Sequence, residues 1–82
     1  MTIVVLYFAA LRELLGSSEE RLRLPDACRS VDDVARHLLA LHPALGPHLA
    51  CVRFARNESF VGGSEPLADG DTLALIPPVS GG

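Results

Sequence analysis

The alternation of hydrophobic and polar residues divides the first part of the chain into two strands and a short helix. Residues 3–8 are β-branched, aliphatic and aromatic without polar interruption, which is typical of a central strand with both faces at least partly covered. Residues 20–24 alternate leucine with charged residues and predict a half-exposed strand. Between them, residues 9–15 are mostly helix formers, and Gly16 is placed to end a short helix. We therefore expect a hairpin of two strands with a small helical excursion between them.

A longer helix is expected over residues 31–41. Ser30 is a favourable N-cap residue, and Asp32 and Asp33 fall in the first turn, where the helix dipole stabilises negative charge. Pro43 ends the helix, because the residue before a proline disfavours the helical conformation. The residues expected on the buried face of this helix are Val31, Val34, Ala35, Leu38 and Leu41. Those expected to share one face of the short helix are Leu11, Leu14 and Leu15.

The second half of the chain predicts three further strands. Residues 44–50 are ambiguous and could form a short helical turn. Residues 52–55 alternate and predict a strand, followed by a turn at 56–59 and a short return strand that begins at 60–61. Residues 72–76 form the last hydrophobic run and predict the final strand.

This order of elements, β–β–α–β–β–β, indicates an α+β fold in which one main helix packs on one face of a mixed sheet. Hairpins at both ends of the chain leave the first and last strands to pair in the middle, which is the β-grasp architecture. Residues 1–76 are expected to form this domain, and residues 77–82 an extended, flexible tail. With 82 residues there is no room for a second domain, and an independent catalytic cleft is hard to fit, so a carrier or binding role is favoured.

Composition excludes several classes of function. The seven cationic residues are all arginines and face ten acidic ones, giving a net charge of −3, whereas a nucleic-acid binder needs an excess of basic residues. The sequence has no cationic amphipathic helix of the kind that binds a membrane surface. The apolar start lacks the basic residues of a signal peptide, so a cytoplasmic protein is expected. Two cysteines make at most one disulfide and do not form a secreted framework. We expect Cys28 to be accessible and Cys51 to be a small core residue.

We expect no metal site. Three histidines and a cysteine lie within one stretch of the chain, at His37, His42, His48 and Cys51. Their spacing does not repeat that of a zinc site, and two prolines interrupt the stretch. The histidines are interpreted as solvent-facing and loop residues.

The C-terminal tail is the most informative feature. It follows the last predicted strand directly and reads Pro77-Pro78-Val79-Ser80-Gly81-Gly82. The two prolines favour a stiff, extended exit from the sheet. The residues after them are small, so the tail is narrow enough to enter a tunnel, and no side chain at Gly81 or Gly82 blocks the terminal carboxylate.

With this tail the chain resembles the small subunits of molybdopterin synthase, which are ubiquitin-like sulfur carriers. The resemblance covers nearly the whole chain and is weakest between residues 25 and 50. Besides the tail, the matching residues are Phe8-Ala9, Arg12-Glu13-Leu14 with Gly16, Asn57, and Leu67 with Asp69-Gly70-Asp71. The chain departs from the pattern at Leu75-Ile76, where some members of the family have an aromatic residue.

The resemblance implies a function for the last residue. An ATP-dependent partner enzyme would adenylate the Gly82 carboxylate, and a sulfur donor would convert it to a thiocarboxylate. The tail would then enter the large synthase subunit, and Gly81, which has no side chain, would allow this access. There the tail would deliver sulfur to a cyclic pterin phosphate, forming the dithiolene of molybdopterin. The acid–base residues would belong to the large subunit, so this chain would bind no cofactor and have no activity alone. Two sulfurs per product are consistent with two carriers on two large subunits, a 2:2 assembly.

The partner interface is expected on the sheet face opposite the helix, together with the tail. The residues assigned to it are Phe8, Arg12, Leu75, Pro77, Pro78, Val79 and Ser80.

Three alternatives remain open at this point. The chain could carry sulfur for another pathway, such as thiamin or cysteine synthesis or tRNA thiolation, although the Pro-Pro-Val-Ser segment fits those relatives less well. It could be a ubiquitin-like protein modifier, although without lysine it could not form branched chains on its own side chains. It could also be an interaction domain with an inert tail.

Overall fold

The computed structural model describes residues 1–78, so the expectations for Val79, Ser80, Gly81 and Gly82 lie outside the described residues. The strands are β1 (Thr2–Tyr7), β2 (Glu19–Arg23), β3 (Arg53–Arg56), β4 (Ser59–Val61) and β5 (Thr72–Ile76). The helices are α1 (Ala10–Leu15), α2 (Val31–Leu41) and α3 (Gly46–Leu49), with a 3₁₀ turn at Pro43–Leu45. No helix in this part of the chain is long and apolar enough to cross a membrane.

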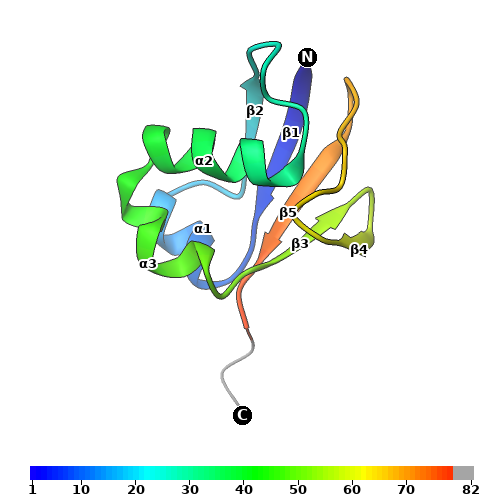
Figure 1. Cartoon of the computed structure of the whole chain (residues 1–82). Coiled ribbons are helices and arrows are strands. Elements are labelled where there is room, and N and C mark those ends of the chain that lie inside the picture. Colours follow the sequence, from blue (N-terminus) through cyan, green and yellow to red (C-terminus); the bar gives the residue numbers. More distant parts are fainter. Residues whose placement is uncertain (79–82) are drawn as a thin grey trace.

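The strands form one five-stranded sheet in the order β2-β1-β5-β3-β4. β1 and β5 pair in parallel at its centre, whereas the other neighbours are antiparallel. Figure 1 shows α2 lying across one face of the sheet, with α1 and α3 at the end from which the chain leaves β5. The N-terminus lies at the opposite end of the molecule from the point where the chain leaves β5 (Figure 1). The ubiquitin-like β-grasp architecture predicted from the sequence, with the first and last strands paired in the middle, is therefore confirmed.

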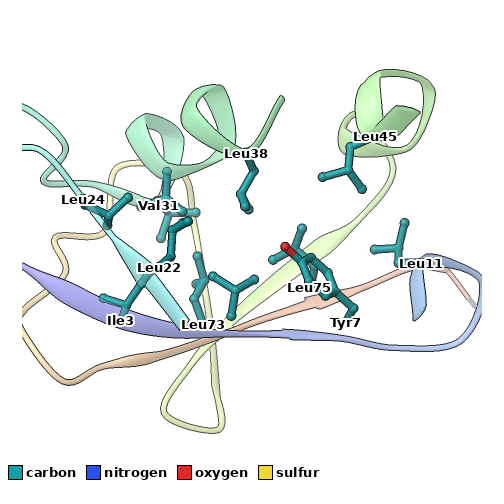
Figure 2. Packing of buried hydrophobic residues seen from close by; sticks show 12 residues of the cluster. Ile3, Tyr7, Leu11, Leu22, Leu24, Val31, Leu38, Leu45, Leu73 and Leu75 are labelled. Atoms are coloured by element: carbon teal, nitrogen blue, oxygen red, sulfur yellow. The ribbon is translucent and has the colours of Figure 1, made fainter. Parts of the chain in front are cut away.

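The core lies between the sheet and its helices. Alternate residues of β1 and β5 point toward α2, and Val31, Val34 and Leu38 of α2 meet them. In Figure 2 the labelled side chains of the sheet all project toward the helices, and Leu11 and Leu45 close one end of the core. The fully buried aliphatic residues are Ile3, Val5, Leu11, Val31, Val34, Leu38, Leu45, Leu73 and Leu75.

Two leucines expected in the core are exposed instead. Leu14 is 42% exposed and Leu41 is 49% exposed. The six-residue α1 buries only Leu11, and the buried stripe of α2 ends one turn before Leu41. The chain then reverses at Pro43, and Leu45 fills this end of the core.

The start of α2 is fixed by a reciprocal cap. The hydroxyl of Ser30 accepts a hydrogen bond from the Asp33 N–H at 3.2 Å, and the Asp33 carboxylate accepts one from the Ser30 N–H at 3.1 Å. The carboxylate also accepts the N–H of Arg29, and these backbone bonds hold the pKa of Asp33 below its ordinary value. Ser30 is thus the N-cap predicted from the sequence.

Replacing this cap should weaken the fold. Ser30→Ala removes one half of the reciprocal pair, so we expect the free energy of unfolding to fall by about 1 kcal/mol in a denaturant titration. The exposed Ser64→Ala is the control, and a surface change of this kind should stay within about 0.5 kcal/mol. Equal effects of the two substitutions would contradict a stabilising role for the cap.

Candidate functional site

The end of the sheet from which the tail leaves is built by the parallel pair. Tyr7 lies opposite Leu75, so β1 and β5 finish side by side. The chain continues from β5 into Pro77, which is half-buried, and Pro78, which is exposed. From β1 it continues into Phe8 and α1 at the same end (Figure 1). The first residues of the tail therefore emerge next to Phe8 and α1.

The sheet face opposite α2, here called the outer face, carries an apolar row across the middle of the sheet. The strand registers place Leu6, Ala74, Ala55 and Phe60 in one row across four strands. Phe60 is 58% exposed at the end of this row, while the two alanines are shielded between their larger neighbours. Ile76 lies on the same face beside the tail exit. This row continues from the tail exit across the sheet as an apolar strip.

Leu75 was expected on the outer face, and this expectation is wrong. Leu75 is fully buried and belongs to the core cluster that packs against the helices. Its cross-strand neighbours are Tyr7 and Phe54, which also face inward. Because side chains alternate along a strand, the residues that β5 presents on its outer face are Ala74 and Ile76. The small size of Ala74 between two leucines was the available signal for this orientation.

Phe8 and Arg12 are both exposed, and their place in an interface stays a prediction. Phe8 is not part of β1, which ends at Tyr7, but begins a tight turn. The Leu11 N–H donates to the Phe8 carbonyl at 3.1 Å, and Ala9 between them has φ 50° and ψ −125°. This is the second position of a type II′ turn, which glycine normally occupies. An alanine held there costs roughly 1–3 kcal/mol.

A carboxylate network fixes the start of β5. Asp71 accepts hydrogen bonds from the Ala68 N–H and the Arg56 Nε–H at 2.7 Å each, and from the Asn57 amide at 3.0 Å. Asn57 also exchanges two hydrogen bonds with the backbone of Thr72. Burial raises the pKa of Asp71, but these donors outweigh it, and the pKa lies below its ordinary value. Two residues that carry the family resemblance, Asn57 and Asp71, are thus structural.

A second polar cluster lies between β1, β2 and the end of α2. Glu20 accepts the Tyr7 hydroxyl at 2.7 Å and lies 2.9 Å from Nε2 of His42. Burial raises the pKa of Tyr7, and the Glu20 carboxylate raises it further. His42 is therefore tied to the sheet and is only partly exposed to solvent.

The remaining candidate residues are dispersed. Cys28 is half-buried as a free thiol, but Cys51 is exposed, so its expected place in the core is wrong. Cys51 lies in the turn before β3 begins, where the chain has not yet entered the sheet. Within residues 1–78 no three His, Cys, Asp or Glu side chains are grouped so that they could hold a metal ion.

The fold defines a ubiquitin-like domain whose chain continues from the central strand β5 into Pro77 and Pro78. The ThiS family model matches residues 5–82, and the chain belongs to this family. It is 42% identical over 84 residues to the molybdopterin synthase sulfur carrier subunit of Chlamydomonas reinhardtii, with all of both chains covered. This result supports the family resemblance seen in the sequence.

Solved structures of similar proteins have the same fold. A putative molybdopterin converting factor subunit 1 from Pyrococcus furiosus has a TM-score of 0.85 at 32% identity and covers 96% of this chain and 99% of its own. SAMP1 from Haloferax volcanii has a TM-score of 0.84 at 33% identity, with both chains fully covered. A chain from a complex of subunits 1 and 2 of the Helicobacter pylori molybdopterin-converting factor shares the fold, with both chains fully covered, a TM-score of 0.73 and 24% identity.

Relieving the turn at Ala9 should stabilise the protein. Ala9→Gly removes roughly 1–3 kcal/mol of backbone strain and adds roughly 0.5–1 kcal/mol of unfolded-state entropy. We therefore expect a net gain of about 1 kcal/mol, measured by thermal and denaturant unfolding. The neighbouring Ala10→Gly, at the first residue of α1, should instead lose up to about 1 kcal/mol. A loss in both variants would contradict strain at Ala9.

The Asp71 network should make stability depend on pH. A lowered pKa in the folded state means that the carboxylate contributes its stability above the unfolded pKa of about 3.9, and that this contribution is lost as pH falls through the folded value. Asp71→Asn should therefore lose roughly 1–3 kcal/mol at pH 7 by leaving the Arg56 guanidinium poorly paired, and less in strong acid.

The control is Asp69→Asn in the same loop. Asp69 accepts the Thr2 N–H through Oδ1 at 2.7 Å, a bond that an asparagine can keep. Unfolding curves between pH 2 and 7 should separate the two variants. Parallel curves for Asp71→Asn and the wild type would show that this carboxylate does not control acid stability.

Proposed function

We propose that this chain is the sulfur carrier subunit of a molybdopterin synthase. The observation that carries the proposal is the sequence Pro77-Pro78-Val79-Ser80-Gly81-Gly82, placed directly after the central strand of a ubiquitin-like domain. The similarity to named sulfur carrier subunits over the full length of both chains supports it.

The chemistry takes place on the Gly82 carboxylate. Its oxygen attacks the α-phosphate of ATP on an activating enzyme, and pyrophosphate leaves. Sulfur delivered at the sulfide level, as HS⁻, then attacks the acyl carbon, AMP leaves with the electron pair of the broken C–O bond, and the product is a thiocarboxylate. The domain supplies no acid, base or cofactor to these steps; ATP is a substrate of the activating enzyme. We place the reaction in the cytoplasm, where ATP is available.

The second half of the function is sulfur delivery. The thiocarboxylate enters a large synthase subunit and transfers sulfur to a cyclic pterin phosphate, with two carriers serving one product in a 2:2 assembly. The outer face supports this role, since Phe60 and Ile76 form an apolar surface continuous with the tail exit. The subunit complex reported for the Helicobacter pylori protein of the same fold is consistent with such a partner.

A protein modifier is the second candidate. This candidate is supported by the structural similarity to SAMP1 from Haloferax volcanii and by the sequence similarity to the small archaeal modifier protein 1 of that organism. A modifier would transfer the activated Gly82 to amines of other proteins, whereas a carrier would acquire sulfur. Intact mass after co-expression with the activating enzyme separates the two, because a sulfur-for-oxygen increment marks a carrier and lysine-linked conjugates mark a modifier.

The position of Gly82 should be essential. Appending one alanine moves the reactive carbon by ~3.3–3.6 Å, and displacements of only ~1 Å can cost ~100-fold in rate. Deleting Gly82 shortens the tail by the same amount, and Gly81→Val adds bulk in a narrow channel. All three variants should form little or no thiocarboxylate in an assay with activating enzyme, ATP and sulfur donor.

The control is the thermal stability of the three variants. None of these changes touches the core, so the melting temperature should equal that of the wild type. Wild-type thiolation of the Gly82 deletion would falsify the carrier proposal, because the residue assigned to the chemistry would be dispensable.

A further inference from the structure

An arginine and an aromatic ring form a stacked pair on the outer face. The guanidinium carbon of Arg53 lies 4.0 Å from the centroid of the Phe60 ring. Arg53 is on β3 opposite Ile76, the last residue of β5 before the tail. Phe60 is on the edge strand β4 and is 58% exposed. The pair therefore lies beside the tail exit, on the apolar row described above.

The charge of this pair is not balanced within the described part of the domain. Arg56 pairs with Asp71 and Glu65, and Arg36 pairs with Asp33. Within residues 1–78, Arg53 has no carboxylate within salt-bridge distance, and the same holds for the other two arginines of the outer face, Arg21 and Arg23. The strand pairing also places the exposed Glu19 on this face, opposite Leu6, so three arginines and one glutamate leave the face with a net positive charge in a chain of net charge −3.

We infer that Arg53, held over Phe60, is a specificity-determining residue that binds a carboxylate on the protein partner seated on the outer face. This inference rests on the proposed function and specifies the chemistry of its partner. The ring covers one face of the guanidinium, while the N–H groups at its edge stay free for a bidentate carboxylate. Stacking also restricts the long side chain in advance, so less conformational entropy is lost on binding.

A nucleic acid fits the same surface less well. Phosphate contacts need a net basic domain, whereas acidic residues outnumber arginines here by ten to seven. A base would stack on a free aromatic face, but Arg53 already covers one face of Phe60. The observations therefore favour an acidic protein surface.

The test measures binding of the full chain to its purified cognate large subunit at several salt concentrations. Arg53→Met should slow association several-fold at low salt and flatten its dependence on salt, because an exposed charge acts mainly on the association rate. Arg53→Glu should weaken affinity about tenfold or more by placing like charges together. Arg29→Glu, the same charge change in the loop before α2, should behave as the wild type. Melting temperatures should be unchanged in all three.

Thiocarboxylate formation by the wild type is measured in parallel and separates the possible failures. If the wild type is thiolated and binds, but Arg53→Glu keeps wild-type affinity and salt dependence, the inference on Arg53 is overturned and the carrier function stands. If the wild type is neither thiolated nor bound, both are overturned. Binding of a single-stranded RNA oligonucleotide that is lost in Arg53→Glu would overturn the inference in favour of a nucleic-acid surface.

Discussion

The parallel pairing of β1 with β5 is the constraint on which the rest of the structure depends. Two parallel neighbours cannot be joined by a tight turn, so the rest of the chain lies between them in the sequence. Within that part, α2 crosses from β2, beside β1, to β3, beside β5, and covers the core face on the way. The same pairing makes the two strands finish at one end of the sheet. The turn at Phe8 and the exit at Pro77 are therefore neighbours because of topology, although they lie at opposite ends of the sequence.

Much of this fold could be predicted from local signals. Ser30, Pro43 and Gly16 act at helix ends through their own backbone and side-chain chemistry, and the last strand was predicted with the bounds observed. Orientation was harder, because it depends on register with other strands. Leu75 was assigned to the wrong face for this reason, and Arg53 and Phe60 were missed because only the pairing of β3 with its neighbours brings them to the tail exit. The interface assignments at Phe8 and Arg12 rest on exposure and on family resemblance alone.

The side chains that stabilise the fold are different from those that are exposed on the outer face. Asp71, Asn57 and Arg56 are engaged in fixing the start of β5, and Tyr7, Glu20 and His42 in fixing the end of α2. The outer face contributes little to the hydrophobic core cluster. This division explains how so small a chain combines a stable fold with exposed side chains on one face of its sheet.

The central parallel pair also determines how the domain responds to mechanical force. The chain enters at the start of β1 and leaves at the end of β5, and the two ends lie on opposite sides of the molecule (Figure 1). Tension applied between the ends acts along these two strands and loads their hydrogen bonds in shear. These bonds must then break together, whereas a hairpin pulled open at its ends would lose them one at a time. A pull on the chain beyond β5 is therefore resisted by several hydrogen bonds at once.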